Sequence, residues 1–277
     1  MTLRLRSGQT RAALLLAGGA GTRLRPLSSD ENPKQFLRLW GGKSLLQLTS
    51  ERVSDLDVFV STNEMYREKV LEHVPSAHVI AEPARRNTAP ALALSCFEIG
   101  ARLGEETVVA ALPADHFIAD PAEFRRVLDG AFDYAEAHDV LVTIGITPTE
   151  PNTGYGYLEL GAPVADGVVA LERFVEKPDR ARAEEFLRAG NYVWNGGIFV
   201  WRVSVFRRAL QEYAPEVANV TRERYGEAPS ISIDYALMEK ARNVVCVPGE
   251  FGWSDVGSWD ALIRAGAEIP EGVRPDA

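Results

Sequence analysis

Residues 14–27 read LLLAGGAGTRLRPL, and this stretch decides the fold more than any other. Its three leucines form a short apolar run that is typical of a buried strand. The run leads directly into a glycine-rich turn, in which backbone amides can face an anion without obstruction from a Cβ atom. Arg23 adds a planar, charged guanidinium at the end of the turn. The stretch therefore predicts a strand followed by a phosphate-binding loop, and the alternative is a tight turn with a surface arginine.

Two other glycine-rich phosphate-binding motifs do not match this turn. A dinucleotide-binding GxGxxG that starts at Gly19 would end at residue 24, which is leucine, and no acidic residue follows at the expected distance. A Walker A loop that ends at residues 42–44 would need glycine at residue 37, which is also leucine. A dinucleotide-dependent dehydrogenase is therefore disfavoured.

A second cation follows the turn within a dozen residues. Pro33 keeps the residue before it extended and presents Lys34 near the same loop. Two cations together with loop amides suit a triphosphate. The alternative is a lysine that simply faces solvent.

The composition limits the class of protein. The chain has 277 residues, of which 46% are hydrophobic and 25% charged, values typical of a folded globular protein. Lys and Arg total 30 against 39 Asp and Glu, a net charge of −9, so we expect no nucleic-acid partner. The only cysteines, Cys96 and Cys246, are far apart and predict neither a disulfide nor a zinc site.

The first 20 residues imitate a secretory signal, because three arginines precede a short apolar run. We reject this interpretation, since the run at 12–17 is at the lower length limit and continues into the glycine-rich turn. No apolar run approaches the roughly 20 residues that cross a bilayer. We expect a cytoplasmic protein without a membrane partner.

Short apolar runs alternate with longer amphipathic runs over the first half of the chain. We expect strands at 12–17, 58–61, 79–81, 107–112 and 140–146. We expect helices at 45–53, 65–73, 89–103 and 122–138. The alternation predicts an α/β fold with a doubly wound, mostly parallel sheet and helices on both faces.

The pattern changes after residue 146. Longer strands, some of them antiparallel, are expected around 154–157, 168–175 and 197–201, with short helices at 180–188 and 204–213. No linker separates the halves, so we predict one domain over 11–265, with lobes at about 11–146 and 147–265 and a cleft between them. Residues 266–277 are predicted to be a poorly ordered tail or the beginning of a further portion.

Eight or so segments match one known family in the same order along the chain. The chain resembles the nucleotide-sugar pyrophosphorylases, particularly the mannose-1-phosphate guanylyltransferases. The resemblance rests on residues 14–27, 82–91, 113–116, 154–157, 176–178, 194–199, 232–239 and 252–259. It implies a Rossmann-like nucleotidyltransferase fold of the glycosyltransferase-A type, with a sugar-binding second lobe.

The resemblance also implies a reaction. GMP would be transferred from GTP to mannose 1-phosphate, which gives GDP-mannose and pyrophosphate; a homodimer is a possible assembly. Alternatives are the same chemistry on glucose 1-phosphate with UTP or dTTP, or a non-catalytic nucleotide-sugar sensor. A sensor would be free to lose Arg23, Lys34, Asp115 and Asp255, and this chain retains them.

The family's functional positions can be carried over to matching residues of this chain. Arg23, Lys34, Asp115 and Asp255 would be catalytic, and Asp115 and Asp255 would hold Mg²⁺. Nucleotide binding would use Ala17, Gly18, Gly19, Ala20, Gly21, Thr22, Arg23, Lys34, Asn87, Thr88, Ala89, Pro113 and Asp115. The sugar phosphate would be bound by Gly154, Tyr155, Glu176, Lys177, Asn195, Gly196 and Asp255.

Each of these segments also has a plainer interpretation. Asp115 follows an expected strand, where open α/β sheets bind ligands, but it could equally cap a helix. Thr88 alone is explained as the cap of the helix that follows. Glu176 and Lys177 alone suit a charged strand end, and His116 suits a packed loop histidine.

The chain departs from the family pattern at two points. Ser29 stands where many relatives carry arginine, so Arg25 is a candidate for supplying the positive charge. Relatives usually continue into a further C-terminal portion, and this chain stops at residue 277.

Overall fold

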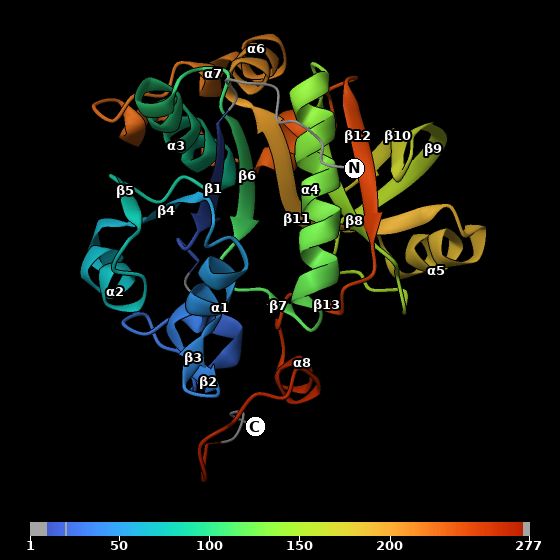
Figure 1. Ribbon diagram of the computed structural model, residues 1–277. Helices are drawn as coiled ribbons and strands as arrows, with labels where there is room; N and C mark the ends of the chain where they lie inside the picture. Colours follow the sequence, from blue (N-terminus) through green and yellow to red (C-terminus); the bar gives the residue numbers. More distant parts are fainter. Residues whose placement is uncertain (1–9, 20, 274–277) are drawn as a thin grey trace.

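The strand that leads into the glycine-rich turn is β1 (Arg11–Leu16), and it lies inside a nine-stranded sheet (Figure 1). The structure is a computed structural model that describes residues 10–19 and 21–273. Ala20, the side chain of Thr22 and residues 274–277 of the predicted tail lie outside that description. The strand order is β5-β4-β1-β6-β11-β8-β12-β10-β9. The bounds are β4 (Asp57–Asn63), β5 (His78–Glu82), β6 (Val108–Pro113), β8 (Leu141–Ile146), β9 (Tyr157–Ala165), β10 (Val168–Val175), β11 (Tyr192–Arg202) and β12 (Val244–Gly249).

Strand direction divides the sheet into two parts. β1, β4, β5 and β6 pair in parallel, as do β8 and β12. β10 and β11 run against the other strands of the sheet. The sheet is therefore parallel in its first half and mixed in its second, as the sequence predicted.

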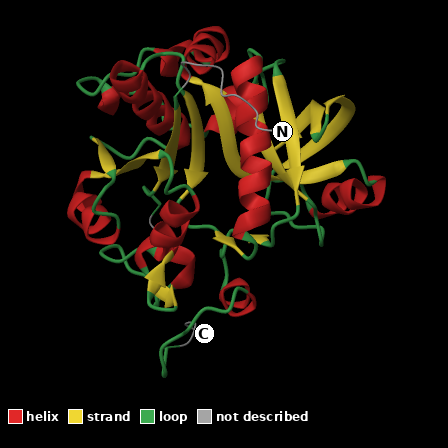
Figure 2. Cartoon of the chain, in the orientation of Figure 1, coloured by secondary structure: helices red, strands yellow, loops and turns green. Residues whose placement is uncertain are grey.

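The alternation of side chains along β1 explains why helices cover both faces (Figure 2). Ala13 and Leu15 join one buried cluster, and Ala12 and Leu14 join the other. The first cluster includes residues of α1 (Leu45–Arg52), α2 (Arg67–His73), α4 (Pro121–Ala137) and α5 (Arg180–Ala189). The second includes residues of α3 (Thr88–Leu103), α6 (Val203–Tyr213) and α7 (Pro215–Ala218). A strand buried on both faces needs this cover, and the doubly wound α/β prediction is confirmed.

Most predicted elements are present with ends displaced by one or two residues. Two strands are exceptions. β11 starts at Tyr192, whereas the predicted strand started at residue 197. β9 covers Tyr157–Ala165, whereas a strand was predicted around 154–157, because residues 154–156 form the turn that precedes it. β12 was not predicted, since a four-residue apolar run such as 244–247 does not distinguish a strand from a helix. Among the described helices, none has the length and apolar character needed to cross a membrane.

A two-stranded ribbon joins distant parts of the chain at the carboxyl end of β6. β7 (Phe117–Ile118) pairs with β13 (Trp253–Ser254) in antiparallel register. A small apolar cluster lies beside it, and α8 (Trp259–Arg264) contributes Leu262 to this cluster. Its other buried members are Leu24, Leu37, Leu39 and Val256. The C-terminal segment is thereby packed against the segment that follows the glycine-rich turn.

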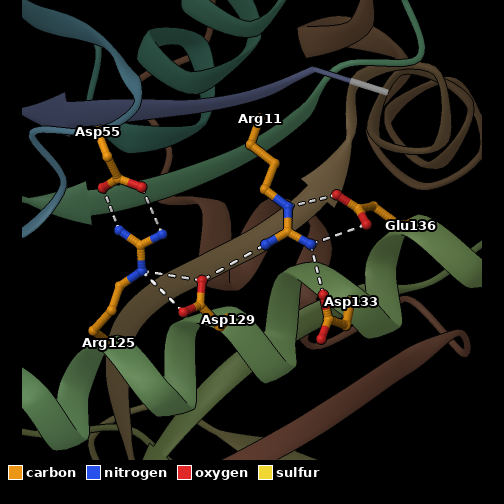
Figure 3. Close-up of polar contacts among 6 residues, drawn as sticks. All are labelled: Arg11, Asp55, Arg125, Asp129, Asp133 and Glu136. Atoms are coloured by element: carbon orange, nitrogen blue, oxygen red, sulfur yellow. Dashed lines mark hydrogen bonds and ion pairs between the residues drawn. The ribbon is translucent and has the colours of Figure 1, made fainter. Parts of the chain in front are cut away.

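An ion-pair network attaches α4 to the start of β1 (Figure 3). Arg11 Nε lies 2.6 Å from Glu136 Oε1, and Arg11 Nη2 lies 2.6 Å from Asp133 Oδ1. Asp129 lies 3.6 Å from Arg11 Nη1 and also contacts Arg125, which continues the network. These hydrogen bonds raise the pKa of Arg11 against the opposing effect of burial. The Arg11 side chain is 17% exposed, so its contacts are partly protected from solvent screening.

We expect Arg11→Met to lower the free energy of unfolding by about 1–3 kcal/mol, because three α4 carboxylates lose a partly buried partner. Urea unfolding followed by circular dichroism measures the change. Arg126→Met is the matched control, since this exposed α4 arginine pairs with Glu123 one turn away on the same helix. Equal stability of both variants would show that the network does not hold α4.

Candidate active site

A cavity of about 450 Å³ opens at the carboxyl ends of the parallel strands. This is the end at which open α/β sheets bind ligands, and the volume suits a small organic molecule. The lining comes from both halves of the chain and includes Gly18, Gly19, Gln35, Glu82, Arg85, Arg86, Asn87, Thr88, Pro113, Asp115, His116, Gly154, Tyr155, Gly156, Glu176, Asn195, Gly196, Asp234, Trp253 and Asp255.

The glycine-rich turn forms one wall and is held from behind. Gln35 Nε2 donates to the carbonyl oxygens of Ala17 and Gly19 at 2.8 and 3.0 Å. Gly21 has a φ of +61°, and a Cβ there would lie 2.7 Å from the backbone nitrogen of Lys34. Only glycine fits this close approach. The turn therefore carries the next segment, with Lys34, directly beneath it.

Lys34 lies between the two predicted metal-binding aspartates. Its Nζ is 2.9 Å from Asp115 Oδ2 and donates to the backbone carbonyl of Asp255 at 2.5 Å. Lys34 is buried, so the solvent-facing alternative for this residue is wrong. Burial would raise the pKa of the Asp115 carboxyl, but the charge of Lys34 and its hydrogen bond act in the opposite direction, and the pKa is lowered. Asp115 is therefore held as a carboxylate.

Asp255 is positioned by contacts from three segments. Its Oδ1 accepts from the Tyr155 hydroxyl at 2.8 Å and from the Gly257 amide at 3.1 Å. Arg23 Nη2 lies 3.5 Å from Asp255 Oδ2, although the Arg23 side chain is 73% exposed. Burial and the Asp255 charge raise the pKa of Tyr155, which therefore remains a donor. Tyr155 was predicted as a sugar ligand, and in the structure its hydroxyl donates a hydrogen bond to the Asp255 carboxylate.

Trp253 determines the tautomer of His116. The indole Nε1 only donates, and it lies 3.0 Å from His116 Nδ1, so Nδ1 is an acceptor and Nε2 carries the proton. Burial lowers the pKa of His116 to about 4, with Lys34 adding to the effect and Asp115 opposing it. His116 is a packed neutral histidine, as the sequence predicted, but it also lines the cavity beside Asp115.

The end of the cavity next to α3 contains a carboxylate that the sequence analysis did not single out. Glu82, the last residue of β5, accepts from Tyr225 at 2.8 Å and from Ser61 at 3.1 Å. Burial raises the pKa of Glu82, and these two donors oppose the rise. The sequence did contain a signal for Glu82, because a carboxylate at the end of an apolar strand, directly before a proline, is unusual enough to indicate a functional residue.

Asn87 and Thr88 join strand β5 to helix α3 beside Glu82. Asn87 has a φ of +66°, and its Oδ1 accepts from the Thr88 amide at the start of α3. Thr88 Oγ1 accepts from the Ile233 amide at 2.9 Å, so the threonine also contacts another segment. Lys177 and Val256 are the other non-glycine residues with positive φ in the described chain, and each adjoins a predicted ligand. Backbone strain at these positions is typical of binding loops.

Two further carboxylates and an amide, from Glu176, Asp234 and Asn195, also line the cavity. The Lys177 Nζ contacts Glu176 Oε1 at 2.5 Å, which raises the pKa of Lys177. Asn195 Nδ2 donates to Asp234 Oδ1 at 3.0 Å. Burial, with the nearby Glu176 charge second, raises the pKa of Asp234 to about 6. Asp234 was part of a matched segment, but the sequence analysis assigned it no role.

The predicted residues divide into two groups. The cavity is lined directly by Gly18, Gly19, Asn87, Thr88, Pro113, Asp115, Gly154, Tyr155, Glu176, Asn195, Gly196 and Asp255. Not among its lining residues are Ala17, Gly21, Arg23, Lys34, Ala89 and Lys177. The backbone amide of Ala17 donates to the Ser61 carbonyl, and that of Ala89 donates to the Ile231 carbonyl. These two amides therefore connect neighbouring backbone segments and are not free for a ligand.

The donor set of Asp115 and Asp255 fits a hard divalent cation. Both groups are carboxylates, and magnesium prefers oxygen ligands. No cluster of three or more His, Cys, Asp or Glu side chains with metal-binding geometry occurs among the residues described. Two protein ligands are compatible with magnesium, which usually completes its shell with water and substrate phosphates.

The sequence profile of the nucleotidyl transferase family matches residues 12–272, so the chain belongs to this family. It is 41% identical over 274 residues to the mannose-1-phosphate guanylyltransferase of Sinorhizobium fredii and 40% identical over 278 residues to that of Escherichia coli. Each alignment covers 90% of this chain but only 53% and 58% of those proteins. The chain therefore spans less than two thirds of these relatives.

Solved structures show the same fold. A crystal structure from Thermus thermophilus, described as a mannose-1-phosphate geranyltransferase, superimposes with a TM-score of 0.85 at 38% identity and covers 93% of this chain and 79% of that one. A Helicobacter pylori structure described as a mannose-6-phosphate isomerase has a TM-score of 0.76 at 27% identity, covering 88% and 99%. These similarities confirm the Rossmann-like nucleotidyltransferase architecture.

We expect the buried neutral His116 to make folding stability pH-dependent. Between pH 6.5 and about 4 the unfolded chain binds a proton that the folded chain does not, so stability falls as the pH is lowered through this window. The effect is on the order of 3 kcal/mol and should be absent in His116→Gln. Urea unfolding at pH 7 and pH 4.5 without added metal measures it. Parallel loss of stability in both proteins would contradict the assignment.

Proposed function

We propose that the chain transfers GMP from GTP to mannose 1-phosphate and releases pyrophosphate. A phosphate oxygen of mannose 1-phosphate attacks the α-phosphorus of GTP, the bond from that phosphorus to the bridging oxygen of the β-phosphate breaks, and GDP-mannose forms. The supporting observation is one cavity whose lining includes Glu82, Glu176 and the two aspartates that Lys34 contacts, Asp115 and Asp255.

The attacking group needs no side-chain base. A phosphate monoester has a second pKa of about 6 and is mostly a dianion at neutral pH. The obstacle is repulsion between anions, since two unit charges about 4 Å apart interact by roughly 4 kcal/mol at an effective dielectric constant of 20. Positioning and electrostatic stabilisation therefore carry the reaction.

The cationic groups of the site have positions that suit this task. Lys34 and Arg23 approach Asp255 from the two segments that follow β1, and Lys177 follows β10. We assign Arg23 and Lys34 to the triphosphate and Lys177 to the sugar phosphate. Asp115 and Asp255 would hold Mg²⁺, which supplies charge neutralisation to the phosphates when it is bound.

Glu82 has the chemistry to read guanine. The guanine edge presents N1–H and a 2-amino group, two adjacent donors that match one carboxylate. Glu82 lines the cavity, and its oxygens are oriented by Ser61 and Tyr225. Adenine has an acceptor at N1 and no 2-amino group, so it would not make these contacts; each lost hydrogen bond to a charged group costs about 1.5–3 kcal/mol. We therefore place the base between Glu82 and Asn87.

The names of the relatives support the same substrate pair. Proteins named mannose-1-phosphate guanylyltransferase are 41% and 40% identical over nine tenths of this chain. We assign the nucleotide to the lobe at 11–146 and the sugar to the lobe at 147–265. A cytoplasmic location and a homodimer belong to the same proposal.

Pyrophosphate release over a grid of nucleoside triphosphates and sugar 1-phosphates tests the activity. We expect the highest kcat/KM for GTP with mannose 1-phosphate, and at least tenfold less with UTP or dTTP and glucose 1-phosphate. Excess EDTA should abolish turnover, and Asp255→Asn should lower it by orders of magnitude while unfolding remains cooperative. A different preferred pair would overturn the substrate assignment, and full activity in EDTA would overturn the metal assignment.

A comparison of GTP with inosine triphosphate, which lacks the 2-amino group, tests the role of Glu82. The wild type should prefer GTP by roughly tenfold or more in kcat/KM, because one hydrogen bond to a charged group is lost with inosine. Glu82→Gln should reduce this preference to within about twofold, since the neutral amide cannot accept both donors. Glu98→Gln, on the surface of α3, is the control. Retained preference in Glu82→Gln would exclude Glu82 from base recognition.

A further inference from the structure

The side-chain amide of Asn195 is held at both of its ends. Its Oδ1 accepts from the Gly197 backbone amide at 3.1 Å and from the Thr143 hydroxyl at 3.3 Å. Its Nδ2 donates to Asp234 Oδ1 at 3.0 Å. Because a backbone N–H can only donate and a carboxylate can only accept, these contacts allow one orientation of the amide.

This orientation limits what Asn195 can offer a ligand. The Nδ2 group has two hydrogens, and Asp234 takes one of them. Both Oδ1 lone pairs are used by Gly197 and Thr143. Asn195 lines the cavity, so the second Nδ2 hydrogen is the group left for a ligand. Toward a sugar, Asn195 is a hydrogen-bond donor.

A matching acceptor, Glu176, lies near Asn195 beside Gly156. A Cβ at Gly156 would lie 2.6 Å from Glu176 Oε2 and 3.4 Å from the Asn195 Cβ, so both side chains pack around this glycine. The Asn195 backbone amide also donates to the Gly156 carbonyl at 2.8 Å. A hydroxyl placed there can accept from Asn195 and donate to Glu176.

Asp234 belongs to a helical segment, whereas Asn195 lies in strand β11. Asp234 is the first residue of a short π-helical turn, Asp234–Met238, and it lines the cavity. Burial and the Glu176 charge raise its pKa to about 6, so it is mostly ionised at neutral pH. An ionised Asp234 can only accept, which keeps the Asn195 amide from reversing.

We propose that Asp234 is a positioning residue for sugar selection, which holds Asn195 as a donor opposite the acceptor Glu176. This inference rests on the proposed function and deepens it. The pocket then distinguishes hexose 1-phosphates by the direction of one hydroxyl, since a hydroxyl of the wrong configuration leaves Asn195 or Glu176 unpaired.

The test compares mannose 1-phosphate with glucose 1-phosphate, which differ only in the configuration at C2. Asp234→Ala should raise the KM for mannose 1-phosphate by about tenfold and reduce the preference over glucose 1-phosphate by a similar factor. The dissociation constant of GTP, measured by calorimetry, should change less than twofold. Asp234→Asn retains an acceptor oxygen and should show a smaller effect. Tyr235→Phe, on the same turn, is the matched control.

A double-mutant cycle separates positioning from a direct contact or a general structural effect. If Asp234 acts through Asn195, Asp234→Ala should change the KM little in an Asn195→Ala background. Additive effects would overturn the proposal, as would equal losses of GTP and sugar affinity. If Asp234→Ala does not unfold cooperatively, Thr143→Val loosens the same amide from its other end and should lower the sugar preference.

Failure of the proposed role of Asp234 can be distinguished from failure of the proposed function. If the wild type prefers another sugar 1-phosphate, the mannose assignment fails, and the same cycle is measured with that substrate and its C2 epimer. Calorimetric binding of the sugar 1-phosphate gives a readout that needs no turnover. Unchanged sugar affinity and preference in Asp234→Ala would overturn the role of Asp234 in either case.

Discussion

The site depends on one constraint, the buried ammonium group of Lys34, which lies between Asp115 and Asp255. Removing a charge from water costs several kcal/mol unless partners replace the lost hydration. Lys34 finds them in the Asp115 carboxylate and the Asp255 carbonyl, which belong to segments 140 residues apart. The segment after β1, the end of β6 and the loop after β13 must therefore meet. Gly21 makes this possible, because no side chain there obstructs Lys34.

Apolar packing around Lys34, Asp115 and Asp255 keeps their three segments together. The β7–β13 ribbon brings Trp253 onto His116, and the apolar cluster around Leu262 covers Val256. Val256 is a β-branched residue at a φ of +47°, a conformation that costs of order 1–3 kcal/mol. Full burial of its side chain compensates for that strain. The loop with Asp255 thus keeps its shape through core contacts made by residues next to it.

The sequence pointed to residues that line the cavity where their chemistry and their position along the chain coincide. Asp115 was identifiable because it follows a buried strand, and the glycine-rich turn because its amides need no Cβ. Glu82 and Asp234 were not identified, because a carboxylate in a local sequence looks the same whether it faces solvent or a cavity. Their proposed roles depend on contacts with Tyr225 and Asn195, which lie far away in the sequence. Tyr155 was identified, but its contact with Asp255 was not.

By itself the sequence determined the layers of the fold and the edge of the sheet at which the cavity opens. Both follow from local periodicity, since β1 alternates between two buried faces and parallel strands end together. Only the tertiary structure decided the insertion of antiparallel β11 between β6 and β8, which places Asn195 at the cavity. It also decided the pairing of Lys34 with the aspartates and the orientation of the Asn195 amide. Each of those outcomes depends on at least one partner more than thirty residues away, and local propensity carries no information about such partners.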